Sequence, residues 1–513
     1  MPHPGQRLRR LLFSERDPCH RVSRTAISRR AFVRAGGAGI ITTLSATRPT
    51  VASSKSAGIV GGGLAGLAAA SVLADAGVDV TVYEARRRPG GRVFSANAPF
   101  APDLVLDLGG AFVNSDHADM TSLIDSLGLT VFDRRSVEDP TLPTEAYFFD
   151  GRWLDEPALS AALRPLADAI DADAALLDED WDANLERLDR QSVADYVHGV
   201  VGTGGTLPIA AVIDRAIRSE YGVDAASASA MELIWLAPQV DGERVALLGA
   251  ADEAYTVVGG AGQVPVRMAE RLGSAVRYGA IVTEVVDEGA AGVRVRLASG
   301  DDARHDAVIV TTPFPAVRTM TVEGSLPPEF VTMVAEARLG RNEKLFAGFD
   351  GRPWRREGGF SREVWNDLGF CTVWDATERQ SDATSAALIF FHGGAEVDPL
   401  LDGSAAAQAA HAVGRLSAAV DGLADRQLPG ALRTGWTRDP LAGGSYTSFA
   451  PGFYSEYADF LWYEYEDGSA DGPLFGNLCF AGEHLSDAYY GYMNGAVETS
   501  RLAATAILTH VLN

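Results

Sequence analysis

A glycine-rich turn between two short apolar strands constrains the fold of this chain more than any other feature. Residues 57–60 predict a strand, residues 61–66 (Gly-Gly-Gly-Leu-Ala-Gly) open an Ala- and Leu-rich helix that ends at Gly77, and residues 78–83 predict a second strand that leads into Glu84. A G-x-G-x-x-G turn between strand and helix, with an acid about 20 residues further on, is typical of a βαβ unit that binds a dinucleotide. The sequence therefore predicts an α/β fold that begins with such a unit.

Each part of this unit has a physical role in holding a dinucleotide. Glycines permit a tight turn and let a pyrophosphate approach the backbone N–H groups at the start of the helix. The acid at the end of the second strand can accept both hydroxyls of a ribose. The residues expected to contact a cofactor here are Gly61, Gly63, Leu64, Ala65, Gly66 and Glu84.

Composition excludes several other classes of protein. The 513 residues are 47% hydrophobic and 22% charged, which is typical of a folded chain of several domain lengths and excludes a disordered or fibrous protein. The formal net charge of −24 repels phosphate backbones, so we expect no nucleic-acid partner. Three cysteines without a C-x-x-C pair and nine scattered histidines predict neither a disulfide framework nor a metal site.

The first fifty residues differ from the rest of the chain. Residues 1–34 are rich in Arg and almost free of acids, and residues 28–32 (Ser-Arg-Arg-Ala-Phe) precede an apolar run that is too short to span a bilayer. This pattern resembles a twin-arginine export signal, and residues 50–52 (Thr-Val-Ala) offer a small-residue cleavage pattern. We therefore expect residues 1–52 to be a signal peptide of an exported protein, periplasmic or secreted. A disordered basic leader or a transit peptide is the alternative.

The remaining chain alternates between helical and strand-like segments. Residues 139–254 are rich in Ala, Leu and Asp with helical periodicity. Strand patterns follow at 281–286, 293–297, 307–311 and 478–480, before a final helix from about Met493 to Leu512. We predict two interleaved domains, a nucleotide-binding domain of residues 55–135, 255–320 and 435–513, and a substrate-binding domain of residues 136–254 and 321–434.

Four motifs occur in an order that is found in a known family. They are residues 84–92 (Glu-Ala-Arg-Arg-Arg-Pro-Gly-Gly-Arg), 107–113 (Asp-Leu-Gly-Gly-Ala-Phe-Val), 480–484 (Phe-Ala-Gly-Glu-His) and 491–498 (Gly-Tyr-Met-Asn-Gly-Ala-Val-Glu). Together they resemble the flavin-containing amine oxidases, which include monoamine, polyamine and L-amino-acid oxidases. The resemblance spans nearly the whole chain after residue 56. It implies an α/β fold in which a Rossmann-like (ββα) FAD-binding domain is interleaved with an α+β substrate-binding domain.

The resemblance also implies which residues hold the cofactor, FAD. The glycines after Asp107 let the backbone approach the flavin ring. The helix that starts near Met493 directs its positive end at the flavin, where it stabilises the negative charge of the reduced ring. The alternative for this segment is a glycine-rich helix that only packs on a strand. The residues implied are Ala85, Arg86, Gly91, Arg92, Gly109, Gly110, Ala111, Val282, Trp436, Gly482, Glu483, Tyr492 and Met493.

Three residues are implied to be catalytic. Residues 443–446 (Gly-Gly-Ser-Tyr) match a family motif whose aromatic residue, here Tyr446, faces a second ring at the position of Tyr492 across the flavin. Two such rings form a slot that admits an amine. Lys344 matches a family lysine that holds a water beside flavin N5. Because the chain contains only Lys55 and Lys344, the presence of this lysine favours catalysis over a solvated surface group.

Ser445 bears on how the cofactor is attached. Some monoamine oxidases carry at this position a cysteine that is bonded to the flavin. A serine cannot form that thioether, so we expect FAD to be bound non-covalently.

The resemblance implies an FAD-dependent amine oxidase. Such an enzyme converts a primary or secondary amine into an imine, which hydrolyses to an aldehyde or ketone plus ammonia or an amine, while dioxygen is reduced to hydrogen peroxide. The alternative is an L-amino-acid oxidase. Many members of that branch carry an arginine after the second Gly-Gly block, where residues 111–117 here read Ala-Phe-Val-Asn-Ser-Asp-His. Its absence favours amines, although Arg341 or another arginine could substitute.

A third hypothesis is a flavoprotein that binds FAD without turnover. It leaves the joint presence of Lys344, Tyr446 and Tyr492 unexplained. The expected partners are therefore a small-molecule amine and dioxygen. We expect no transmembrane span, and a homodimer is one option for an oligomeric state that the sequence leaves open.

Overall fold

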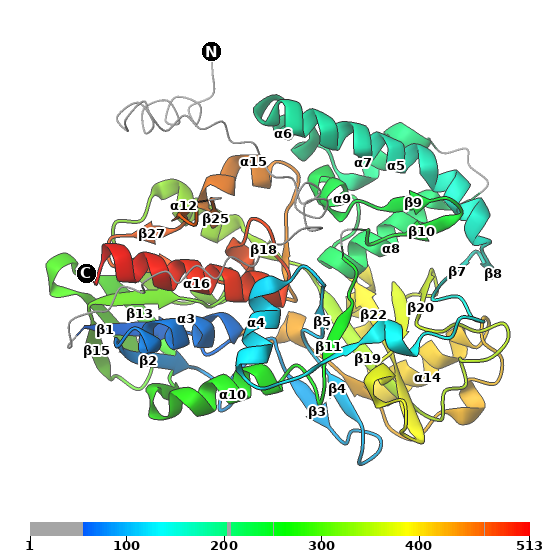
Figure 1. The fold of residues 1–513 in the computed structure, drawn as a ribbon, viewed down its shortest axis with the longest axis horizontal. Coiled ribbons are helices and arrows are strands. Elements are labelled where there is room, and N and C mark those ends of the chain that lie inside the picture. The colour runs from blue at the N-terminus through cyan, green and yellow to red at the C-terminus, as the bar shows by residue number, and fades with distance from the viewer. Residues whose placement is uncertain (1–54, 203–206, 250, 466, 513) are drawn as a thin grey trace.

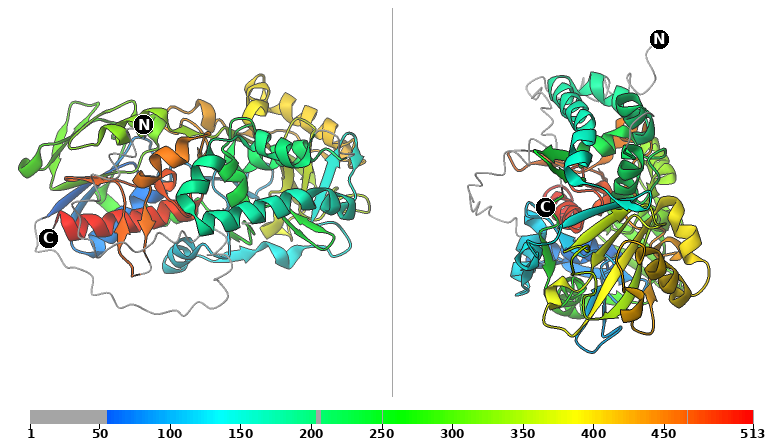
Figure 2. Two further views of the ribbon diagram at one scale, coloured as in Figure 1. Left: turned by 90° about the horizontal axis from the view of Figure 1, so that it is seen from above. Right: turned by 90° about the vertical axis from the view of Figure 1, so that its right-hand side faces the viewer.

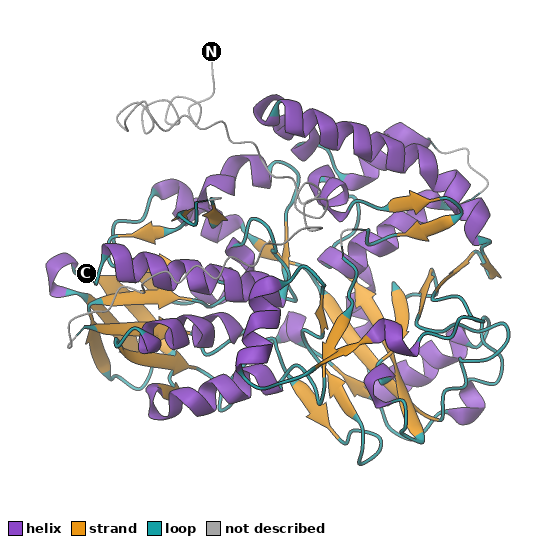
Figure 3. Cartoon of the chain, in the orientation of Figure 1, coloured by secondary structure: helices purple, strands orange, loops and turns teal. Residues whose placement is uncertain are grey.

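The computed structural model describes residues 55–202, 207–249, 251–465 and 467–512, so the predicted signal peptide lies outside the described residues. Two lobes lie side by side, each built on its own β-sheet (Figure 1). We call them the nucleotide lobe, on the left of Figure 1, and the substrate lobe, on the right. Figure 3 shows these two sheets, with helices around them and a few short strands elsewhere.

The nucleotide lobe is built on a six-stranded sheet whose strands come from distant parts of the chain. Its first five strands are parallel and the last is antiparallel to its neighbour. The central strand β16 is buried at every residue, as expected for an apolar strand covered on both faces. In spatial order the strands are β12 (Val276–Tyr278), β2 (Asp79–Glu84), β1 (Ser56–Val60), β16 (Ala307–Val310), β28 (Leu478–Phe480) and β27 (Leu474–Phe475).

Helices cover one face of this sheet and a second sheet covers the other (Figure 2). The helix that follows the glycine-rich turn, α3 (Leu64–Asp75), packs against the C-terminal helix α16 (Met493–His510). Helices α10 (Gln263–Leu272) and α4 (Ala118–Ser126) lie beside them. The opposite face carries a four-stranded sheet of β15 (Asp302–His305), β14 (Val293–Leu297), β13 (Val282–Asp287) and β17 (Thr321–Glu323).

Short strands and helices complete the described part of the fold. The three-stranded sheet consists of β5 (Phe112–Val113), β11 (Tyr255–Val257) and β6 (Val131–Asp133). The two-stranded pairs are β3 (Ser95–Asn97) with β4 (Val105–Asp107), β18 (Arg338–Leu339) with β24 (Thr447–Ser448), and β25 (Tyr463–Glu464) with β26 (Ala470–Asp471). The short helices are α11 (Phe314–Val317), α12 (Pro328–Glu336) and α15 (Phe453–Tyr457), and α12 contacts both of the others.

The substrate lobe is built on a seven-stranded sheet with its own apolar core. Long strand β19 carries Lys344 and pairs with β22 along nine residues. In spatial order the strands are β23 (Leu432–Arg433), β19 (Asn342–Asp350), β22 (Ser385–Gly393), β21 (Thr372–Asp375), β20 (Glu363–Asn366), β7 (Glu145–Phe149) and β8 (Arg152–Trp153). Helices α13 (Val397–Leu401) and α14 (Ala405–Leu416) belong to the same lobe.

The predicted helical segment at 139–254 is largely helical but also contains strands. Its helices are α5 (Glu156–Glu179), α6 (Trp181–Asp189), α7 (Val193–Val201), α8 (Ile209–Tyr221) and α9 (Ala230–Leu236). The expectation of helix is wrong for β7 and β8 and for the hairpin β9 (Gln239–Asp241) and β10 (Arg244–Ala246). Residues 147–149 are Tyr-Phe-Phe, an aromatic run that favours a strand, and β7 pairs with β20 from a distant part of the chain.

The predicted fold class is confirmed: a Rossmann-like α/β unit is combined with an α+β lobe. The six-stranded sheet draws its strands from three separate stretches of the chain, and the seven-stranded sheet from two. The exact domain boundaries stay a prediction. Among the described residues, no helix is both long enough and apolar enough to cross a membrane.

Candidate active site

The turn between β1 and α3 has the close packing that its glycines predict. A Cβ placed on Gly66 would lie 1.9 Å from the Gly61 carbonyl oxygen, so only glycine allows helix and turn to approach this closely. Beside Gly63, in contrast, a Cβ would meet no atom within 4 Å. Helix α3 starts there without a side-chain cap, and its first residues are Leu64 and Ala65. The uncapped helix start beside open space is suited to hold a phosphate group.

Glu84 stands at the end of β2, facing this turn. Its carboxylate accepts hydrogen bonds from the backbone N–H groups of Gly62 at 2.8 Å and Arg86 at 2.6 Å. Burial raises the pKa of Glu84, and the two N–H donors oppose that rise. Each carboxylate oxygen has further acceptor capacity for a ribose hydroxyl. The backbone of Glu84 also accepts from Ala280, two residues before Val282, which brings the start of β13 close to this acid.

The loop after β2 contacts a loop that lies more than 300 residues later in the chain. Ala85 and Arg86 follow Glu84, and the Arg86 guanidinium pairs with Asp439 at 2.8 Å. Asp439 lies in the same loop as Trp436, whose indole N–H donates to the Leu108 carbonyl at 3.0 Å. Three motifs that are far apart in the sequence are therefore joined at one place.

The second Gly-Gly block packs closely against the first motif. A Cβ on Gly109 would lie 1.7 Å from the Arg92 carbonyl oxygen, and one on Gly110 would lie 2.9 Å from the Met493 side chain. This block, which continues into Ala111, therefore contacts the segment of Gly91 and Arg92 on one side and the start of α16 on the other. Larger residues at these glycines would separate the segments.

A partly buried ion pair connects the closing motif to the first one. The Arg92 guanidinium donates to Glu483 at 2.7 Å and to the Ser445 carbonyl at 2.6 Å. Glu483 follows Gly482 and also accepts from the backbone N–H of Gly491 at 2.8 Å. Burial alone would raise its pKa, but the Arg92 charge, His484 and the hydrogen bonds from Arg92 and Gly491 together hold the pKa of Glu483 below its ordinary value. The pair fixes the loop in front of α16, which begins at Met493 without a side-chain cap.

The Lys344 side chain contacts the backbone of the second Gly-Gly block. Its Nζ donates to the backbone carbonyls of Asp107 at 3.1 Å and Gly109 at 2.7 Å, and it lies 5.9 Å from the centre of the Trp374 ring. The side chain is buried, and burial lowers the pKa of Lys344 to about 8. This amine is thus turned inward and can lose its proton near neutral pH.

The two predicted slot tyrosines, Tyr446 and Tyr492, are held by the end of helix α8. The Tyr446 hydroxyl donates to the Ser219 carbonyl at 2.5 Å, and the Tyr492 hydroxyl donates to the Glu220 carboxylate. The two tyrosines are also near each other, because a Cβ on Gly491 would lie 3.9 Å from the Tyr446 ring. Burial raises the pKa of Tyr446 well above its ordinary value, so its hydroxyl stays protonated.

Ser445 is buried, and both its hydroxyl and its backbone N–H are hydrogen-bonded. Its hydroxyl donates to the Asn342 side chain at 2.7 Å, while its backbone N–H donates to the Gly340 carbonyl at 2.8 Å. The residue carries no thiol, and a structural hydrogen bond occupies its hydroxyl.

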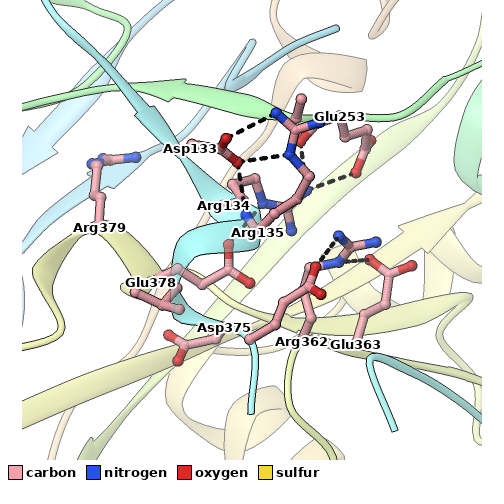
Figure 4. A network of polar contacts seen from close by, with 12 residues as sticks. Asp133, Arg134, Arg135, Glu253, Arg362, Glu363, Asp375, Glu378 and Arg379 are labelled. Atoms are coloured by element: carbon pink, nitrogen blue, oxygen red, sulfur yellow. Dashed lines mark hydrogen bonds and ion pairs between the residues drawn. The ribbon is translucent and has the colours of Figure 1, made fainter. Parts of the chain in front are cut away.

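Sequence reasoning missed four residues of this region, and no motif marks them. Ser219 and Glu220 belong to a helix whose apolar pattern indicated only packing. Glu253 lies in the segment before β11, and Arg134 is buried at the end of β6. Arg134 donates to Glu378 at 2.7 Å and pairs with Glu253 at 3.1 Å (Figure 4). A buried, doubly paired arginine can be recognised only once the fold brings these segments together.

The arrangement fits a bound FAD. The open backbone at Gly63 and the acid at Glu84 suit the pyrophosphate and ribose, while the close contacts at Gly109 and Gly110 suit a flat ring. Among the described residues, the buried Thr312 hydroxyl beside Gly61 has no hydrogen-bond partner, which is the kind of polar atom a bound group satisfies. The individual roles of the predicted cofactor and catalytic residues stay predictions.

Residues 64–508 match the family model described as "Flavin containing amine oxidoreductase". The chain belongs to this family. As a member of the flavin-containing amine oxidoreductases it is an oxidoreductase that acts on small-molecule amines and uses FAD. The predicted family and cofactor are thereby confirmed.

Relatives within the family differ in what their names describe. The chain is 24% identical over 470 residues to "Amine oxidase [flavin-containing] B" of Rattus norvegicus, covering 88% of this chain and 85% of that protein. It is 24% identical over 479 residues to an "L-amino acid dehydrogenase" of Synechocystis sp., covering 88% and 94%.

Two solved structures of flavin amine oxidoreductases have a similar fold. One is wild-type putrescine oxidase bound to putrescine, with a TM-score of 0.74 and 24% identity, covering 89% of this chain and 99% of that one. The other is cyclohexylamine oxidase from Brevibacterium oxydans IH-35A, with a TM-score of 0.74 and 24% identity, covering 90% and 99%. At this identity the likeness shows the fold alone.

Proposed function

We propose that this protein is an FAD-dependent amine oxidase, which converts a primary or secondary amine into an imine and passes the electrons to dioxygen. The imine then hydrolyses to an aldehyde or ketone plus ammonia or an amine. The observation that carries the proposal is the placement of Lys344, whose buried amine binds the Asp107 and Gly109 carbonyls at the predicted flavin face. Bound FAD supplies the hydride acceptor and, through dioxygen, the formation of hydrogen peroxide.

The side chains of this site have distinct tasks in such a reaction. Tyr446 and Tyr492 present their rings to the substrate, and their hydroxyls are fixed by α8, so the rings keep one orientation. Ring faces carry negative charge density and attract an amine. Lys344, with a pKa of about 8, can hold a water and exchange a proton with it near neutral pH. Arg92 and Glu483 hold the loop before α16 in place.

The second candidate is an L-amino-acid oxidase. It is supported by the Synechocystis relative, whose name describes an L-amino acid dehydrogenase. Such an enzyme needs a cation for the substrate carboxylate. Arg341, one residue that could substitute for the missing arginine, pairs with Asp398 at 2.5 Å. Arg134 pairs with both Glu253 and Glu378. Since both guanidiniums already have carboxylate partners, we favour amines over amino acids.

Export by the twin-arginine route is a further part of the proposal. Support comes from the Arg29-Arg30 pair, the short apolar run behind it and the small residues 50–52. Changing both arginines to lysine in the full chain is expected to retain the protein in the cytoplasm. An unchanged distribution between cell fractions would contradict the export proposal and leave the catalytic one intact.

The test of the catalytic proposal needs only the purified protein. Its flavin spectrum is recorded, and amines and L-amino acids are each screened for hydrogen peroxide formation. Peroxide from amines supports an amine oxidase, whereas peroxide from amino acids alone supports the second candidate. A flavin-loaded protein that neither substrate class reduces would contradict both.

A further inference from the structure

The hydroxyls of both slot tyrosines donate hydrogen bonds to two consecutive residues of helix α8. Ser219 offers a backbone carbonyl to Tyr446, and Glu220 offers a carboxylate to Tyr492. A carbonyl can be supplied by any residue type, but the carboxylate is specific to position 220. Glu220 therefore brings a negative charge directly to the edge of the slot, in addition to orienting one of its rings.

The charge of Glu220 is felt by the groups around it. It raises the pKa of Tyr446, to which burial makes the largest contribution. Burial raises the pKa of Glu253 to about 7 against the opposing charge of Arg134, and Glu363 and Glu220 add to the rise. Glu253 in turn acts on Tyr446 and on Lys344. Two acidic side chains from different segments thus act on the same slot.

The cations near Glu253 are shared with other carboxylates. Arg134 is shared, since its guanidinium pairs with Glu253 at 3.1 Å and with Glu378 at 2.7 Å (Figure 4). Arg362 faces Glu363 at 3.9 Å and Glu145 at 3.5 Å.

Tyr492 itself has a second neighbour that fixes its ring. The His117 ring lies 5.0 Å away in an edge-to-face arrangement, and its Nδ1 accepts from the backbone N–H of Asn114 at 3.1 Å. Tyr492 is thus held by His117 at its ring and by Glu220 at its hydroxyl. Packing at the ring would preserve its place if the hydroxyl contact were lost, so the charge of Glu220 can be tested apart from the position of the ring.

Resting on the function proposed above, we propose that Glu220 is a specificity-determining and positioning residue, which recognises the positive charge of an amine substrate in the tyrosine slot and repels the carboxylate of an amino acid. A substrate ammonium placed between the rings and this carboxylate gains both cation–π and charge–charge attraction. An α-carboxylate at the same place would face a like charge. The class selected is amines that carry no acid group next to the nitrogen.

The first test uses binding without turnover. The tert-butylammonium ion has no hydrogen on the carbon that carries nitrogen, so it cannot be oxidised, and tert-butanol is its neutral counterpart of the same shape. Binding to the FAD-loaded protein is followed by the change in the flavin absorption band. Glu220→Gln keeps an oxygen that can accept the Tyr492 hydroxyl but removes the charge. We expect it to weaken tert-butylammonium binding about 10- to 100-fold and to leave tert-butanol binding unchanged.

Three variants separate charge from structure. Tyr492→Phe removes the tether but keeps both the ring and the Glu220 charge, so it should lower kcat and retain the preference for tert-butylammonium over tert-butanol. Glu329→Gln changes an exposed acid on α12 and should alter neither ligand. Binding of tert-butylammonium should weaken at low pH as Glu253 takes up a proton. Because the Glu220 charge helps to raise the pKa of Glu253, Glu220→Gln should shift this loss of binding to lower pH.

The second test compares turnover of phenethylamine and L-phenylalanine, which differ by the α-carboxylate. The wild type should prefer the amine, and Glu220→Gln should raise KM for the amine about 10- to 100-fold with kcat nearly unchanged, so that the preference shrinks. If Glu220→Gln loses tert-butylammonium and tert-butanol binding equally, or binds both as tightly as the wild type does, the role of Glu220 is overturned. A wild type that binds neither ligand overturns it as well. Absence of turnover with intact charge selectivity would instead contradict the proposed function.

Discussion

Replacement of Lys344 by arginine tests the proposed chemistry at a single atom. The Nζ of Lys344 makes two hydrogen bonds to backbone carbonyls in a buried site, and each bond from a charged donor contributes about 1.5–3 kcal/mol. Arginine keeps the formal charge, but its planar guanidinium is bulkier and is effectively never deprotonated. It can therefore neither exchange a proton near pH 8 nor occupy the place of a compact amine beside one water.

The expected loss is that of a positioned acid–base group, about 10²- to 10⁴-fold in rate. Lys344→Arg should retain FAD and its fold but lose at least about 100-fold in one half-reaction. The matched control is Lys55→Arg, since Lys55 is a partly exposed lysine at 3.6 Å from Asp306 and should change stability by less than about 0.5 kcal/mol. Stopped-flow measurement of anaerobic flavin reduction by an amine, and of reoxidation by dioxygen, separates the two steps. Wild-type rates in both would remove Lys344 from the mechanism.

Three further outcomes are expected. Acid or heat should release FAD without proteolysis, because Ser445 has no thiol; flavin left on the precipitated chain would show a covalent link at another residue. The ratio kcat/KM for a simple amine should rise from pH 6 to about 9, because one proton must leave an ammonium whose pKa is near 10 before hydride transfer, whether before or after binding; a flat profile would contradict this. Burial lowers the pKa of Lys344 to about 8 from an ordinary 10.5, so the unfolded chain binds more protons between these values. The free energy of unfolding should therefore rise across pH 8 to 10.5 by up to about 3 kcal/mol relative to Lys344→Met, measured by urea titration, and a constant difference would refute the lowered pKa.

The sequence predicts best where local signals are strong. The expected strands at 293–297 and 478–480 coincide with β14 and β28, and the expected final helix starts at Met493 as α16 does. In these segments turn residues, apolar pattern and β-propensity agree. The strands β7 and β10 were missed because they lie inside a long Ala- and Leu-rich segment, where the average pattern is helical. Pairing with the distant strand β20 decides β7, and a short local hairpin with β9 decides β10.

The residues of the candidate site also differ in how well the sequence predicts them. Lys344 could be predicted because it is one of two lysines and lies in a motif, and Gly66 because its spacing requires close packing. Glu220 could not, because one acid near the end of an amphipathic helix has no distinguishing neighbour in the sequence. Its contact with Tyr492 arises from the docking of α8 onto a loop 272 residues away. Glu253 likewise gains its partner Arg134 only through the pairing of β11 with β6.

The central claim is that this site oxidises amines with FAD. The most direct measurement is anaerobic mixing of the FAD-loaded protein with an amine, while the absorption band of oxidised flavin is followed and the carbonyl product is quantified. The account predicts that the band disappears, that one carbonyl product forms per flavin, and that dioxygen then restores the band with one hydrogen peroxide per flavin. A band that no amine diminishes, in a protein that retains its FAD and its fold, would contradict it.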